Sequence, residues 1–172
     1  MKRHTLQHST AVLASVAFLA LGASDAAAQK VGKKFGSWTF QCAAVEANKT
    51  RCALIQELML TVKDQPRRRL LNASLTPIRN GFLLETLMPL GIEIPKGTTV
   101  KVDQGKPTRM TLQRCATAGC VATMELTGSM LTAFKKGRNL EVTFFARSPG
   151  GLKPIKVPVS LKGVSEGLSQ LK

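Results

Sequence analysis

Four cysteines are the residues whose type and spacing could do chemistry in this chain. They form two couples, Cys42 with Cys52 and Cys115 with Cys120, the second in the stretch RCATAGCVA. Closely spaced cysteines hold metals, exchange disulfides or form structural disulfides. Separations of ten and five positions fit neither the C-x-x-C of a redox site nor the paired knuckles of a four-cysteine zinc site. We therefore interpret all four as structural disulfides.

The pairing of these cysteines is not fixed by the sequence, because four cysteines allow three connectivities. We favour Cys42–Cys52 and Cys115–Cys120, since each couple brackets a polar turn between two apolar stretches. A short hairpin brings its flanking residues within disulfide reach. Disulfides of this kind persist in an oxidising compartment, so the chain is expected to be exported.

The N-terminus predicts that export. Lys2 and Arg3 precede an apolar run over residues 11–23, and small residues stand before a cleavage point after Ala28. This is the pattern of a bacterial secretory signal peptide, predicted here over residues 1–28. The run is too short for a spanning helix, which needs roughly 20 apolar residues, and no later stretch provides one. We expect a periplasmic or secreted protein, with association to the outer membrane as an option.

Histidine is missing from the predicted mature segment, residues 29–172, because His4 and His8 both lie in the predicted signal peptide. No Ser-His-Asp or Cys-His arrangement and no histidine-containing zinc or iron site can be built without it. The segment also lacks a glycine-rich nucleotide motif and a clustered acidic metal loop. We predict no catalytic residue, no metal and no cofactor.

A histidine-free carboxylate hydrolase remains an alternative. It would need two carboxylates held within roughly 5–10 Å in a cleft, and the sequence spacing defines no such pair. The candidate acids are Glu57, Glu85, Glu93, Asp103, Glu125 and Glu141.

The elements that must position these side chains are mostly strands. In SWTFQCA, Trp38, Phe40 and Cys42 alternate with polar residues, which is typical of a half-buried strand. Similar stretches follow at about ten-residue spacing with turn signals such as Asn80-Gly81 and Thr76-Pro77 between them. The pattern predicts one all-β domain, a sandwich or barrel of about eight or nine strands. Two short helices are expected, in GSMLTAFKKGRN and VSEGLSQLK.

The landmarks of the chain, taken in order, carry a family resemblance. They are FGSWTFQC, RCALIQE, MPLGIEIPKGTTVKVDQG, RCATAGCVA, LTAFKKGRNLEVTF and VSLKGVSEGLSQL. Over roughly residues 35–171 the chain resembles the invasion-associated locus B family of exported bacterial proteins. The resemblance implies an immunoglobulin-like β-sandwich, a place in the periplasm or cell envelope and, for some members, a role in host-cell invasion. It implies no catalytic site.

Charge is the strongest functional indication. The chain has 25 Lys and Arg against 10 Asp and Glu, a net charge of +15, which falls to +14 without residues 1–28. Such a field favours docking on an anionic envelope or host-surface ligand, and guanidinium groups match phosphate and carboxylate oxygens. A solvated basic surface without a partner is the alternative. The predicted anionic-surface residues are Lys33, Lys34, Arg67, Arg68, Arg69, Lys135, Lys136 and Arg138.

The sequence therefore leaves three candidate functions. The first is a disulfide-stapled, non-enzymatic envelope protein that binds an anionic surface or partner. The second is the hydrolase, and the third is a periplasmic chaperone that binds strands at a sheet edge. Nucleic acid is not expected as a partner, because the chain has no tyrosine, one tryptophan on a predicted core strand and a predicted export signal. The sequence defines neither the specific partner nor the oligomeric state.

Overall fold

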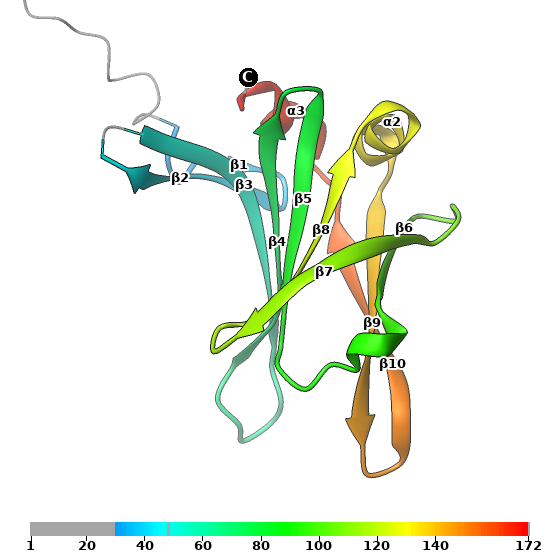
Figure 1. The fold of residues 1–172 in the computed structure, drawn as a ribbon. Helices are drawn as coiled ribbons and strands as arrows, with labels where there is room; N and C mark the ends of the chain where they lie inside the picture. Colours follow the sequence, from blue (N-terminus) through cyan, green and yellow to red (C-terminus); the bar gives the residue numbers. More distant parts are fainter. Residues whose placement is uncertain (1–29, 48, 172) are drawn as a thin grey trace, which may run out of the picture.

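The computed structural model describes residues 30–47 and 49–171, so the predicted signal peptide lies outside the described residues. Ten antiparallel strands follow one another in the order β1-β2-β3-β4-β5-β8-β7-β6-β9-β10 (Figure 1). The strands are β1 (Lys34–Phe35), β2 (Trp38–Glu46), β3 (Lys49–Leu60), β4 (Arg68–Ile78), β5 (Gly81–Met88), β6 (Thr98–Val102), β7 (Thr108–Ala116), β8 (Gly119–Leu126), β9 (Asn139–Ser148) and β10 (Gly151–Ser160).

The predicted all-β fold with short helices is confirmed. Strands β2 to β10 agree with the predicted eight or nine strands, and the tenth strand is the two-residue β1. The helices are α2 (Gly128–Lys136) and α3 (Val164–Ser169), with a 3₁₀ turn η1 at Ile94–Lys96. One turn signal was wrong, because Thr76 and Pro77 lie inside β4. Pro77 is tolerated there because β4 has passed its last paired residue with β3, Leu75.

Strand β7 joins the two halves of the sandwich. Its first residues, Thr108–Met110, pair with β6, whereas Thr111–Ala116 pair with β8. The first half-sheet therefore runs from β1 through β5 and β8, and the second contains β6, β9 and β10. A strand that changes sheets in this way makes a corner, so the ten strands curl around one core instead of forming two separate layers.

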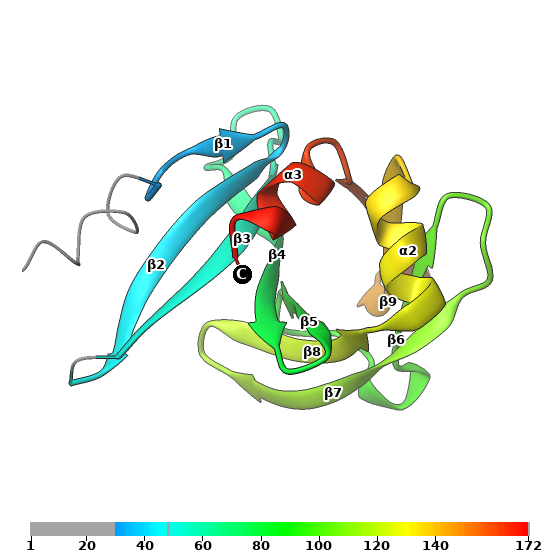
Figure 2. The same ribbon diagram turned by 90° about the horizontal axis from the view of Figure 1, so that it is seen from above.

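One end of the curled sheet is covered by helices, and we call it the helical end. Figure 2 shows α2 and α3 over this end. Phe134 of α2 and Leu168 of α3 are fully buried with Trp38 and Phe35 from the first strands. The opposite end, which we call the open end, carries the β3–β4 connection (residues 61–67), the β5–η1 connection (89–93) and the β9–β10 turn (149–150) (Figure 1).

The two outer parts of the sheet meet along a seam between β3 and β10. At the helical end, side-chain hydrogen bonds connect the two sides of the seam, in place of backbone pairing between strands. Trp38 Nε1 and Gln56 Nε2 both donate to the Ser160 carbonyl oxygen at 2.9 Å, and the Ser160 amide donates to Gln56 Oε1 at 3.0 Å. Trp38 is thus a core residue with its indole N–H satisfied at the seam.

Candidate functional site

Both predicted disulfides are present, and each links directly opposed residues of neighbouring strands. Cys42 faces Cys52 across β2 and β3, and Cys115 faces Cys120 across β7 and β8, with a Cα–Cα distance of 4.0 Å in each pair. No free cysteine exists among the described residues. Bonded cysteines supply no thiolate, so these residues act as structural links between strands.

The eight predicted basic residues do not form one surface. Lys33 and Lys34 beside β1, and Lys135 to Arg138 at the end of α2, belong to the helical end, where α3 contacts both β1 and α2. Arg68 and Arg69 begin β4 at the open end, and Arg67 directly precedes them in the β3–β4 connection (Figure 1). The structure therefore divides the predicted set into two groups at opposite ends of the sandwich.

Most of these cations have no acidic neighbour. Ion pairs within the described residues involve only Arg69 from the predicted set, whose guanidinium lies 3.5 Å from Glu57 Oε1. Lys33 instead lies over the Phe35 ring, 5.1 Å from its centroid. Seven of the eight cations thus form no ion pair in the part of the chain that the structure describes, and of these seven Arg138 lies near the Asp103 carboxylate, whose pKa its charge helps to lower.

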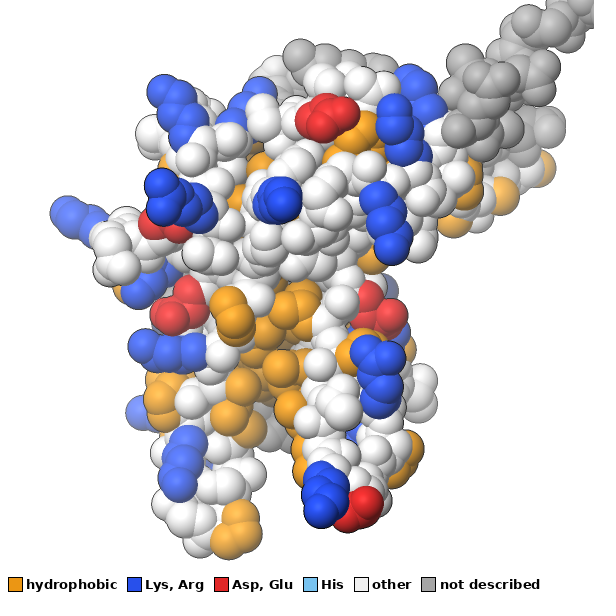
Figure 3. Space-filling view, turned by 180° about the vertical axis from the view of Figure 1, so that it is seen from behind, with side chains coloured by type: hydrophobic (Ala, Val, Ile, Leu, Met, Phe, Trp, Pro, Cys, Tyr) orange, Lys and Arg blue, Asp and Glu red, His pale blue; other side chains and the backbone are white. Residues whose placement is uncertain are grey.

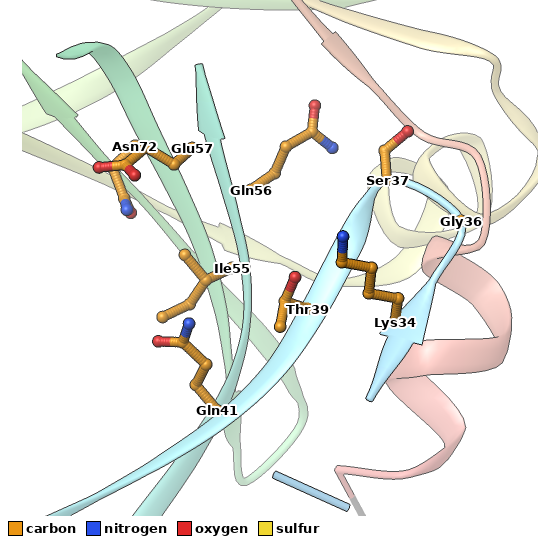
Figure 4. Close-up of a pocket in the computed structure, with 9 residues that line it drawn as sticks. All are labelled: Lys34, Gly36, Ser37, Thr39, Gln41, Ile55, Gln56, Glu57 and Asn72. Carbon is orange, nitrogen blue, oxygen red and sulfur yellow. The ribbon is translucent and has the colours of Figure 1, made fainter. Parts of the chain in front are cut away.

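A polar recess of about 480 Å³ lies on the outer face of the first strands (Figure 4). Glu57 and Asn72 are cross-strand neighbours within it, and Lys34 is the neighbour of Thr39. Its lining is Lys34, Gly36, Ser37, Thr39, Gln41, Ile55, Gln56, Glu57 and Asn72. With a single carboxylate, already paired with Arg69, the recess can hold a polar group by hydrogen bonds but offers no acid–base pair.

Two of the candidate acids do share a pocket. Asp103 and Glu141 line a shallow pocket of about 270 Å³. The Asp103 carboxylate accepts the amides of Asn139 at 2.9 Å and Arg138 at 3.1 Å, and these backbone hydrogen bonds, Asn139 first, lower its pKa below the usual 3.8. A carboxyl group that loses its proton so readily cannot serve as a general acid near neutral pH.

Glu141 is also occupied. Its Oε1 lies 3.6 Å from Lys101 Nζ and 3.7 Å from Lys156 Nζ, on the two strands that flank β9. Both carboxylates of this pocket therefore link neighbouring strands and loops. Within residues 30–47 and 49–171, no cluster of three His, Cys, Asp or Glu side chains is arranged to hold a metal ion.

The part of the seam towards the open end, beyond the hydrogen bonds between Gln56 and Ser160, was not predicted from the sequence. Beyond Gln56, β3 has a strand partner on one side only, β4, and β10 pairs only with β9 among the described residues. Five large apolar side chains of the open end are exposed: Met59, Leu60, Val62, Leu90 and Ile94. The one signal available beforehand was the pair Pro154 and Pro158, since proline in a strand indicates a sheet edge.

No helix in the described part of the chain has the length and apolar character needed to span a bilayer. Comparison with known proteins gives consistent relatives. The chain is 29% identical over 145 residues to an invasion protein B homologue of Brucella abortus (strain 2308), which covers 84% of this chain and 80% of that protein. It is 27% identical over 159 residues to invasion protein B of Bartonella bacilliformis, covering 91% and 80% respectively.

A solved structure shares the fold. The crystal structure of invasion associated protein B from Bartonella henselae matches with a TM-score of 0.65 at 24% identity, over 81% of this chain and 92% of that one. The family model of the invasion associated locus B (IalB) protein matches residues 38–172. Because that match spans most of the sequence, the chain belongs to the invasion associated locus B family.

Proposed function

We propose that this chain is an exported, non-enzymatic protein of the periplasm or cell envelope that docks on an anionic surface or partner. The observation that carries the proposal is the excess of exposed cations, seven of the eight predicted ones having no ion pair within the described residues. Basic residues near an anionic lipid surface each contribute about 1 kcal/mol to binding. The two disulfides suit an oxidising compartment.

A non-enzymatic role is supported by how the acids are used. The Asp103 carboxylate accepts backbone amides, Glu141 pairs with lysines and Glu57 pairs with an arginine. Each of these carboxylates therefore has a structural contact within the fold. The names of the relatives, invasion protein B, agree with a surface-binding role in contact between the bacterium and a host cell.

Two matched variants test the proposal. Arg67→Ser/Arg68→Ser removes two charges from the open end and leaves the Arg69–Glu57 pair intact. Lys135→Ser/Lys136→Ser removes the same charge from the helical end. Exposed charges contribute little to folding, so both variants should keep the stability of the wild type to within about 0.5 kcal/mol.

Co-sedimentation with phosphatidylglycerol vesicles is the measurement, with phosphatidylcholine vesicles as the neutral control. Wild type should bind the anionic vesicles at low salt and release them near 0.15 M salt, where the Debye length is about 8 Å. Loss of two contacts should weaken binding about 30-fold at low salt for the variant at the docking end. Salt-independent binding, no binding, or two variants that both behave as wild type would each contradict the proposal.

A further inference from the structure

The apolar interior is not covered along the whole seam. Side chains of β3 that point inward are buried at Leu54 and Gln56, half-buried at Leu58, and 45% exposed at Leu60. On the facing strand β10, Val159 and Val157 are buried and Ile155 is half-buried. Figure 3 shows the result from behind, a hollow with hydrophobic side chains at its base between the β3–β4 arm and the β9–β10 hairpin. We call this hollow the seam groove.

A β-bulge adds to the apolar wall of the seam groove. The pairing of β3 with β4 passes from Leu58–Leu71 to Met59–Arg69, which leaves Leu70 as an extra residue on β4. A bulge lets two consecutive side chains turn towards the same side. Leu70 accordingly packs against the core beside the fully buried Leu71.

An additional strand is a poor occupant of the seam groove on its β10 side, because that edge has few amide donors. In an antiparallel strand alternate residues direct their amide and carbonyl groups to the same side. Ser160 bonds across the seam, so Pro158, Lys156 and Pro154 also direct their backbone away from β9. The two prolines have no N–H, which leaves the amides of Lys156 and Leu152 as the β10 donors for an incoming strand. An acyl chain needs no such donors.

Charge at the mouth of the groove is mostly positive. Lys153 shares the inward-facing side of β10 with Ile155, two positions closer to the open end. Lys63, Arg67 and Arg68 lie in or after the β3–β4 connection, which also contains Asp64. The other acids nearby, Glu57 and Glu93, are paired with Arg69 and Arg147. The mouth thus suits a negatively charged headgroup.

We infer that the seam groove binds the acyl chain of an anionic lipid, with the chain between β3 and β10 and the headgroup at Lys153, Arg67 and Arg68. The inference rests on the proposed function, because it identifies the chemistry of the anionic partner. It adds that the open end is the docking end and that the partner has a long apolar chain.

Two neighbouring residues provide a matched test. Leu60 and Met59 are exposed to similar extents, 45% and 38%, but alternation points Leu60 into the groove and Met59 away from it. Titration calorimetry with oleate below its micelle concentration should show binding by wild type and Met59→Asn. Leu60→Asn should bind at least about tenfold more weakly, because it replaces apolar contact with a polar amide. Octanoate, with the same headgroup and a short chain, should bind more weakly than oleate to wild type.

The outcomes separate this inference from the proposed function. If phosphatidylglycerol vesicles bind in a salt-dependent way but oleate does not bind, or Leu60→Asn equals Met59→Asn, the seam groove is no lipid site and the anionic docking stands. If oleate binds with the expected pattern but both charge variants bind vesicles as wild type does, the groove stands and the docking fails. A second copy in the groove would give concentration-dependent sedimentation that Leu60→Asn abolishes, without oleate binding, and would also overturn the inference.

Discussion

The helical end and the open end are built from the same strands but finish differently. At the helical end, α2 and α3 contribute Phe134 and Leu168 to the same core as Trp38, and all three side chains are fully buried. At the open end no helix covers the inward-facing side chains, and Leu58, Leu60 and Ile155 remain partly exposed. Alternation on β3 and β10 is unbroken between the two ends, so the covering elements decide which inward positions are buried.

This difference separates the part of the molecule that stabilises the fold from the part that is free to bind. Burial of apolar area contributes about 25 cal/mol per Å², so the fully buried side chains of the helical end add to stability in a way that the exposed side chains of the open end do not. The open end keeps several exposed apolar side chains close together, and a contiguous apolar patch of this kind marks a site where a ligand or partner binds. Substitutions at the two ends should therefore have very different effects on folding.

The largest effect is expected from Phe134→Ala in α2. Removing a fully buried aromatic side chain leaves a cavity beneath the helix and should lower the free energy of unfolding by about 3–5 kcal/mol. Leu60→Ala, at the open end, should change it by less than about 1 kcal/mol, since the side chain is already exposed to solvent. Urea denaturation followed by tryptophan fluorescence measures both, and equal losses would remove the distinction between the two ends.

An intermediate effect is expected where the closed and open parts of the seam meet. Gln56→Leu removes the acceptor of the Ser160 amide and one donor to its carbonyl oxygen, and should cost about 1–3 kcal/mol. Hydrogen exchange at the Ser160 amide should accelerate in the variant. Gln41→Leu is the control, because Gln41 is an exposed residue of the outer recess. If exchange at Ser160 were unchanged, the seam would be held by other contacts.

The smallest effect is expected with pH at Asp103, next to the end of α2. The folded state lowers its pKa through the Asn139 and Arg138 amides, so its contribution is present above pH 3.8 and is lost as pH falls through the folded pKa. Between pH 6 and pH 2.5, the melting temperature of wild type should therefore fall more than that of Asp103→Asn. Asp64→Asn, at the open end, is the control and should follow wild type. Parallel curves for all three proteins would contradict the assignment.

The strands were predictable because their alternation is local. Trp38, Phe40 and Cys42 lie on one face of β2, as their alternation predicts, and the polar turns between the cysteines favoured the two disulfides that the structure contains. The two-residue β1 was missed because so short a strand has no period. Pro77 was misread because its tolerance depends on where β3 stops pairing with β4, which is a property of two strands and not of one.

The candidate site was much less predictable, since it depends on how the sheet curls. Arg67–Arg69 and Lys135–Lys136 have the same local chemistry in the sequence, yet the fold places them at opposite ends. Likewise, Leu54 and Leu60 occupy equivalent positions in the alternation of β3, and only the distant strand β10 and the helices make one buried and the other exposed. Tertiary context of this kind leaves no trace in a short window of sequence.

The strand shared between the two halves, β7, has a consequence for how the protein unfolds. One continuous strand pairs with β6 over Thr108–Met110 and with β8 over Thr111–Ala116, so opening of either half loosens a strand that the other half also holds. Partial opening of one half is thereby penalised, and the halves behave as a single cooperative unit instead of two independently melting layers. The strands that flank β7 also pair with strands far away in the sequence. Strand β6 pairs with β9, and β8 pairs with β5. Such non-local pairing should make folding slow, of the order of milliseconds to seconds, so the unfolded chain should remain open to proteases longer than a helical bundle of the same length would.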